Sequence, residues 1–176
     1  MQKVYDEVNS LDTNCYEQFD LSEDILMEHA ATSMLDFIEK NFENKSTILI
    51  VSGSGNNGAD GIALSRLLYG KYKVTLFCPF GTNTEMSKKQ ANRALLVGTE
   101  ISQSYSILTS SYDVVVDCLF GTGLNKPLDE SSHKIITQIN KMDSYKISCD
   151  ISSGINNLGQ IESIAFKSNT TITMGA

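Results

Sequence analysis

Three short hydrophobic runs in this chain are each followed at once by a loop of glycine and polar residues. The runs span residues 47–51, 114–116 and 145–149, and the loops span residues 53–61, 117–123 and 150–154. Segments with helical periodicity separate them, and this alternation predicts βαβ units and a mostly parallel sheet. Loops at the carboxyl ends of parallel strands gather in one crevice, where ligands bind. The sequence therefore predicts an α/β fold with one shared site at that edge of the sheet.

The remaining segments complete a three-layer αβα sandwich with a Rossmann-like order of elements. Residues 1–45 are predicted to be mainly helical, with one helix that begins at an N-cap Ser22 and ends near Lys40. Its apolar residues recur at helical spacing and predict one buried stripe, formed by Leu26, Ala30, Met34, Phe37 and Ile38. Further helices are predicted over residues 58–68, 87–97 and 129–141, and further strands over 73–77, near 101, over 113–117 and over 170–174.

The length of 176 residues is sufficient for one domain with a hydrophobic core. We find no internal repeat or linker, so we expect a single domain over residues 1–176. The sequence stops directly after the last strand-like run, which is an abrupt end for a doubly wound fold. Two alternatives stay open here: the domain lacks its C-terminal end, or it is cut from a longer fusion protein.

The composition narrows the range of partners. The formal net charge is −7, and no block of lysine or arginine occurs, which argues against an extended surface for nucleic acid or for an anionic membrane. No run approaches the ~18 apolar residues that a membrane span needs, and the first residues contain no apolar signal region. We therefore expect a cytoplasmic protein. The cysteines form no CxxC pair, which favours reduced, structural thiols over a redox or metal role for Cys15, Cys78, Cys118 and Cys149.

The first loop matches the dinucleotide-binding pattern GxGxxG between Gly53 and Gly58. That pattern requires an acid about 20 residues further on to hold a ribose, but the segment from Phe77 reads Phe-Cys-Pro-Phe. Asp60 would also place a carboxylate beside the expected pyrophosphate. A Walker A loop is excluded because no Gly-Lys-Ser/Thr follows. These features argue against a hydride-transfer enzyme that uses NAD or FAD.

Residues 26–31, 53–61, 117–127, 150–154 and 171–174 each match a motif of one known family. In these motifs the chain resembles the NAD(P)H-hydrate epimerase family, also called the YjeF N-terminal domain. The first loop is similar to the family's GxGNNGGDG, and residues 26–31 are similar to its LMExAG segment. Residues 117–127 resemble its DALFGTGL segment, residues 150–154 resemble DIPSG, and residues 171–174 resemble the strand that follows. The order and spacing of these motifs match along nearly the whole chain.

The resemblance implies roles for individual residues. It implies that hydrated nicotinamide dinucleotides, NADHX or NADPHX, bind along Asn56, Asn57, Gly58, Ala59, Asp60, Gly121, Thr122, Gly123, Leu124, Asn125, Lys126 and Pro127. Asp150 would contact the reacting ring as the catalytic residue. Asn57, Asp117 and Ser153 would hold one potassium ion per subunit, and oxygen donors of this kind suit a large monovalent cation. Such an ion would also offset the repulsion between Asp117 and Asp150.

The implied reaction is the inversion of C6 of the nicotinamide ring, which converts the R epimer into the S epimer without a redox change. Asp150 would protonate the departing hydroxyl and help water return on the other face. The resemblance also implies a homodimer through the N-terminal helical region. It further implies an ADP- or ATP-dependent NAD(P)H-hydrate dehydratase as functional partner, separate or fused.

The sequence leaves some alternatives open. Ala59 replaces the second glycine of GNNGGDG, so its backbone must keep φ below zero, and Ser152 replaces the proline of DIPSG and removes a φ restraint. Taken singly, Asp117, Asp150 and Ser153 could be turn or capping residues. Some relatives use this fold as a non-enzymatic dimerisation or ligand-binding module, which is the alternative function. The histidines, His29 and His133, are interpreted as surface or packing residues, and Lys126 as either solvated or close to a substrate phosphate.

Overall fold

The computed structural model describes residues 9–124, 126–156, 158–161 and 163–174, with side chains from residue 14 onward. The helices are α1 (Asn9–Phe19), α2 (Glu23–Asn41), α3 (Asn56–Leu68), α4 (Glu85–Val97), the 3₁₀ helix η1 (Tyr105–Thr109) and α5 (Glu130–Lys141). The strands are β1 (Thr47–Ser52), β2 (Lys73–Phe77), β3 (Ile101–Ser102), β4 (Val114–Cys118), β5 (Tyr145–Cys149) and β6 (Thr170–Ile172). The alternating order of strands and helices confirms the predicted α/β class.

The six strands form one sheet in the order β3-β2-β1-β4-β5-β6. Each described pair of neighbouring strands is parallel, so the sheet is more uniform than the mostly parallel sheet that the sequence predicts. The chain runs from β1 outward to β3, returns to the centre at β4, and then runs outward to β6. The boundary between β1 and β4 is therefore the topological switch point, the place where ligands bind in sheets of this kind.

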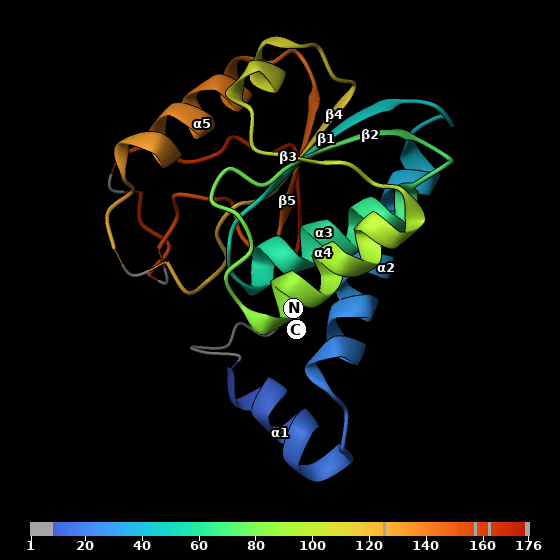
Figure 1. Cartoon of the computed structure of the whole chain (residues 1–176). Coiled ribbons are helices and arrows are strands. Elements are labelled where there is room, and N and C mark those ends of the chain that lie inside the picture. The colour runs from blue at the N-terminus through green and yellow to red at the C-terminus, as the bar shows by residue number, and fades with distance from the viewer. Residues whose placement is uncertain (1–8, 125, 157, 162, 175–176) are drawn as a thin grey trace.

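Alternating residues of the strands build two cores, one on each face of the sheet. Ile48 and Ile50 of β1 pack with α2, α3 and α4, whereas Leu49 and Val51 pack with α5 and η1. Figure 1 shows the resulting layers, with α5 on one side of the strands and α2–α4 on the other. The predicted three-layer sandwich is confirmed.

The N-terminal segment is mainly helical where the structure describes it, as predicted, and residues 1–8 lie outside the described part. In Figure 1, α1 projects away from the body that the sheet and the other helices form. The buried stripe of α2 differs from the predicted one: Met34 and Ile38 are fully buried, but Met27 and Ala31 take the other inner places. Leu26, Ala30 and Phe37 are only half-buried, because α2 is rotated so that its neighbouring positions face α3.

Two helices begin earlier than the sequence predicts, and each has a local cause. Helix α4 begins at Glu85 because the Thr84 hydroxyl accepts a hydrogen bond from the Ser87 N–H at 3.0 Å. Helix α3 begins at Asn56, with the Ala59 N–H donating to the Gly55 carbonyl at 3.1 Å. Asp60 therefore lies beyond the first turn of α3, whereas a helix that began at Gly58, as predicted, would place it within that turn. Ser22 does precede α2, but its side chain makes no capping hydrogen bond.

Within the described part of the chain, no helix combines the length and the apolar composition that crossing a membrane would require.

Candidate functional site

The three predicted loops leave the carboxyl ends of β1, β4 and β5, which are consecutive strands in the centre of the sheet. Residues 53–55 join β1 to α3, residues 119–129 join β4 to α5, and residues 150–169 join β5 to β6. In the register of the sheet, Val51 lies opposite Asp117, and Asp117 lies opposite Ser148. The strands therefore end at the same level, and their loops meet at the switch point.

Close backbone packing holds the first loop against the second. A Cβ atom at Gly53 would lie 1.9 Å from the carbonyl oxygen of Leu119, and one at Gly58 would lie 1.9 Å from the carbonyl oxygen of Gly53. The Gly53 N–H also donates to the Cys118 carbonyl at 2.9 Å. No side chain fits at either glycine, because real Cβ atoms do not approach backbone atoms this closely.

Asp117 is fully buried and joins the second loop to the third. Its Oδ1 accepts hydrogen bonds from the Ser153 hydroxyl at 2.7 Å and from the Leu119 N–H at 3.1 Å. Its Oδ2 accepts the Ser153 N–H at 2.8 Å. Burial raises the pKa of Asp117 to about 6, although these hydrogen bonds lower it in part. Asp117 is therefore a buried acid held by two loops and not an exposed turn residue.

Asp150 occupies a strained turn directly after β5. Its φ is +66°, and the Ile151 N–H donates back to the Cys149 carbonyl at 2.8 Å. A three-residue turn of this sense is rare and costs free energy. Its Oδ2 accepts the Thr122 N–H at 3.4 Å and lies 3.4 Å from the position that a Cβ at Gly121 would take. The backbone thus holds this carboxylate above the second loop.

Asn57 reaches the same point from the first turn of α3. Its Cβ and Cγ lie 3.2 and 3.4 Å from the position of a Cβ at Gly121, so Asn57 and Asp150 flank that glycine. Its side-chain Nδ2 is buried and has no hydrogen-bond partner, which is unusual for a buried polar group. Asn56 points elsewhere, because its Nδ2 donates to Glu23 Oε1 of α2 at 2.5 Å.

The other predicted site residues have mixed environments. Ala59 lies on α3, is fully buried in the core and does not have a positive φ, so its side chain does not reach a ligand. Asp60 is half-buried. The hydrogen bond to Cys118 and burial raise the pKa of the Cys149 thiol, and the nearby charge of Asp60 adds to this rise. Gly58 is buried on α3. The described residues of the second loop are half-buried or exposed, and they are Gly121, Thr122, Gly123, Leu124, Lys126 and Pro127. Asn125 lies outside the described residues.

The cysteines behave as small apolar residues. Cys78, Cys118 and Cys149 are free and fully buried near the carboxyl ends of β2, β4 and β5. Burial raises the pKa of Cys78 to about 12, so this thiol is a poor nucleophile. Both histidines are exposed, as interpreted from the sequence.

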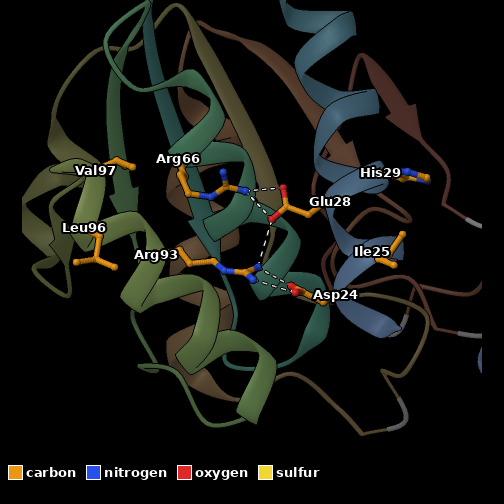
Figure 2. Close-up of a pocket in the computed structure, with 8 residues that line it drawn as sticks. All are labelled: Asp24, Ile25, Glu28, His29, Arg66, Arg93, Leu96 and Val97. Atoms are coloured by element: carbon orange, nitrogen blue, oxygen red, sulfur yellow. Dashed lines mark hydrogen bonds and ion pairs between the residues drawn. The ribbon is translucent and has the colours of Figure 1, made fainter. Parts of the chain in front are cut away.

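Sequence reasoning missed a groove of about 630 Å³ on the face that α2, α3 and α4 cover. Figure 2 shows Arg66 and Arg93 reaching from α3 and α4 toward Glu28 and Asp24 of α2. The apolar side chains at its rim are Ile25, Leu96 and Val97. The four-residue spacing of the two acids could indicate one helix face, but no signal in the sequence pairs them with these arginines. Lys89 of α4 also pairs with Asp24, and these ion pairs join the three helices.

We expect Asp24→Asn to weaken this network in a pH-dependent way. Hydrogen bonds from Arg93, together with Lys89, lower the pKa of Asp24 from 3.8 to about 2. The stabilisation is therefore present above pH 3.8 and is lost as the pH falls toward 2. Near pH 7 the variant should lose about 1 kcal/mol of unfolding free energy, because the pair is partly exposed.

Urea unfolding at several pH values measures the difference between the two proteins. That difference should shrink below pH 4, while Asp36→Asn, an exposed change on the same helix, should follow the wild type throughout. A difference that stays constant down to pH 2 would contradict the assigned ion pair.

Comparison with known proteins identifies relatives along the whole described fold. The family described as YjeF-related protein N-terminus matches residues 23–176. A "bifunctional NAD(P)H-hydrate repair enzyme Nnr" of Helicobacter pylori is 36% identical over 179 residues, which cover 100% of this chain and 38% of that protein. An "NAD(P)H-hydrate epimerase" of Leuconostoc kimchii is 34% identical over 177 residues, covering 96% of this chain and 76% of that protein.

The crystal structure of the yeast protein ynu0 (YNL200c) has a similar fold. It superposes with a TM-score of 0.85 at 21% identity and covers 98% of this chain and 80% of the yeast chain. At this identity the likeness concerns the fold alone. The chain thus spans most of the Leuconostoc protein but only 38% of the Helicobacter protein.

Proposed function

The chain belongs to the family of YjeF-related protein N-termini, and on that basis we propose that it is an NAD(P)H-hydrate epimerase. It would interconvert the R and S epimers of NADHX and NADPHX at C6 of the nicotinamide ring, as part of cofactor repair. The observation that carries the proposal is the placement of Asp150, which a strained turn holds beside Asn57 and Gly121 at the switch point. The relatives named as epimerases support the same reaction.

The first and second loops would bind the dinucleotide and its phosphates. The N-cap residue of α3 is Gly55, which has no side chain to cap the amides of the first turn. Uncapped amides at a helix N-terminus attract phosphate through hydrogen bonds and the helix dipole. The backbone of residues 121–124 and exposed Lys126 would line the neighbouring part of the site. Together these groups bind an anion although the net charge of the chain is −7.

Asp150 would act as general acid and base. The carboxyl group donates a proton to the C6 hydroxyl, which leaves as water while the ring nitrogen supplies the electron pair and becomes cationic. A second water then adds to C6 from the opposite face, and its proton returns to the carboxylate. Proton and oxygen balance over the cycle, and no redox change occurs. Positioned carboxyl groups contribute about 10²–10⁴-fold in such steps.

We also propose that Asn57, Asp117 and Ser153 hold one potassium ion per subunit. The unpartnered amide of Asn57 supports this fit, because a rotation of the amide by 180° puts its oxygen at the same buried position. Amide, carboxylate and hydroxyl oxygens are hard donors that suit such a cation. Among the described residues, no cluster of histidine, cysteine and acidic side chains competes as a metal site. When bound, the ion supplies positive charge that offsets Asp117 and Asp150.

Potassium should therefore stabilise the protein without any substrate. Replacing sodium with potassium at about ten times its Kd should raise Tm by about 3–6 °C, because the ion binds only the folded state. Asn57→Ala should remove this difference, whereas Asn92→Ala, an exposed change on α4, should keep it. Thermal unfolding in the two salts measures it. Equal Tm values for the wild type in sodium and potassium would contradict the potassium site.

We also make proposals for the oligomeric state of the protein, its functional partner and its cellular compartment. We propose a homodimer through the N-terminal helices, supported by Phe19 on α1, which is 67% exposed, and by the half-buried apolar side chains on α2. An NAD(P)H-hydrate dehydratase would be the functional partner, and the Helicobacter relative, named as bifunctional, supports a fused arrangement. Free, buried thiols are typical of a reducing compartment, so we propose the cytoplasm.

The experiment that tests the proposed function starts from one purified epimer of NADHX. Chromatography follows the ratio of R to S epimer in buffer and in the presence of the protein. An epimerase brings the ratio to equilibrium far faster than buffer does. A ratio that changes at the buffer rate would instead favour a non-enzymatic module of the same fold.

A further inference from the structure

A chain of four hydroxyl groups lies behind the loop that carries Asp150. The Oγ atoms of Ser148 and Ser152 are 2.8 Å apart, and those of Ser152 and Ser168 are 3.0 Å apart. Ser168 then lies 3.3 Å from the Thr171 hydroxyl. The chain thus starts in β5, passes through the loop and ends in β6, and Ser148 and Thr171 are also paired in the sheet.

Ser152 stands at the centre of this chain and is almost inaccessible to solvent. Ser152 is 6% exposed, and Ser148 is fully buried. A buried hydroxyl that loses its partner costs more free energy than the bond contributes. The loop therefore cannot lift away from β5 and β6 without leaving buried hydroxyls unpaired.

The residues on both sides of Ser152 carry the site. Asp150, two residues before it, has a positive φ that persists only if its surroundings enforce it. Ser153, directly after it, gives its N–H and hydroxyl to Asp117. Backbone bonds from Asp150 N–H to the Ile172 carbonyl, and from the Ile155 N–H to the Ser152 carbonyl, hold the ends of the segment at 2.8 and 3.1 Å. Ser152 adds a second side-chain tie to the sheet, through Ser148 of β5.

We propose that Ser152 is a positioning residue, whose hydrogen bonds to Ser148 and Ser168 keep the Asp150 turn and Ser153 in place over the switch point. It touches no reacting atom and acts through Asp150. The effect on catalysis rests on the proposed epimerase function, whereas the effect on loop opening does not. The proposal also explains why this chain can have Ser152 where the related motif has proline. The hydrogen bonds of the serine restrain the loop, as the fixed φ of proline would.

Deuterium exchange of peptides that cover residues 148–155, in the protein without substrate, measures the loop directly. Ser152→Ala should speed exchange there by about 10-fold, because local opening becomes easier when a buried hydrogen bond is lost. Ser144→Ala is the matched control, since the buried Ser144 hydroxyl near the start of β5 has no hydrogen-bond partner. In the Ser144→Ala protein, the exchange rate of the same peptides should stay within about 2-fold of the wild-type rate.

Epimerisation kinetics test the catalytic consequence. Ser152→Ala should lower kcat by about 10-fold and leave KM within about 2-fold, because misplacing a reacting group affects the chemical step more than substrate binding. Should Ser152→Ala fail to fold, Ser168→Ala breaks the outer bond of the chain and should change both readouts in the same direction.

Unchanged exchange in the Ser152→Ala protein, or faster exchange with unchanged kcat, would overturn the proposal. If the wild type shows no epimerase activity but exchange still rises, the proposed function fails while the anchoring role of Ser152 stands.

Discussion

Asp150→Asn should abolish epimerisation while leaving the protein folded. The amide can neither donate the proton that the departing hydroxyl needs nor accept one from the incoming water. We expect kcat to fall by about 10²–10⁴-fold, the usual contribution of a positioned acid–base group. The fold should survive because asparagine tolerates a positive φ at least as well as aspartate does. Its carbonyl oxygen can also accept the Thr122 N–H.

Two measurements separate the chemical effect from a structural one. The Tm of Asp150→Asn should stay close to that of the wild type, and NMR or circular dichroism should report the same fold. Asp143→Asn changes an exposed aspartate near the start of the same strand and should retain full activity. If Asp150→Asn retained more than about a tenth of wild-type kcat, Asp150 would not be the acid–base group.

Gly53→Ala should strongly destabilise the protein. The added methyl group would lie 1.9 Å from the backbone oxygen of Leu119, so the first and second loops would have to separate. Because the methyl group meets backbone atoms, no flexible side chain can move to relieve the clash. We expect the free energy of unfolding to fall by about 3 kcal/mol or more. For a protein of this size that corresponds to a fall in Tm of about 10 °C. Thermal or urea unfolding measures it.

Gly55→Ala provides the matched control two residues away in the same loop. A Cβ there meets nothing within 4 Å, and Gly55 is not among the residues with positive φ. The free energy of unfolding of the Gly55→Ala protein should therefore stay within about 0.5 kcal/mol of the wild-type value. Similar losses in both variants would mean that the loop needs glycine for flexibility and not for the close approach of two backbones.

The fold could be predicted because its signals are local and repeated. Strand runs such as residues 47–51 end in glycine loops, and helices with apolar faces follow them. The α/β class and the order of strands and α-helices could therefore be predicted, whereas the 3₁₀ helix η1 was not. The sequence predicts the exact ends of the helices, and the face that each helix buries, less well. The rotation of α2 that buries Met27 and Ala31 depends on packing with α3, and packing between distant segments leaves no periodic signal in either one.

The candidate site could be located but not described in detail. That Asn57, Gly121 and Asp150 meet follows from three loops at one edge of a parallel sheet. The positive φ of Asp150 and the burial of Asp117 could not be predicted from the positions of the loops. The Asp150 turn depends on a backbone hydrogen bond to Ile172, and the environment of Asp117 depends on Ser153. The roles of these residues in binding substrate and potassium stay predictions. The hydroxyl chain through Ser152 and the ion-pair groove had no signal, because their members are far apart in the sequence.

The most direct test of the proposed function is epimerisation of a single NADHX epimer in ¹⁸O-labelled water, followed by chromatography and mass spectrometry. The proposed chemistry breaks the C6–O bond and adds water from the opposite face, so each inversion should install one ¹⁸O atom. We predict labelled product at a rate at least about 100-fold above buffer. Inversion at the buffer rate would contradict the proposed activity, and fast inversion without label would contradict the role given to Asp150.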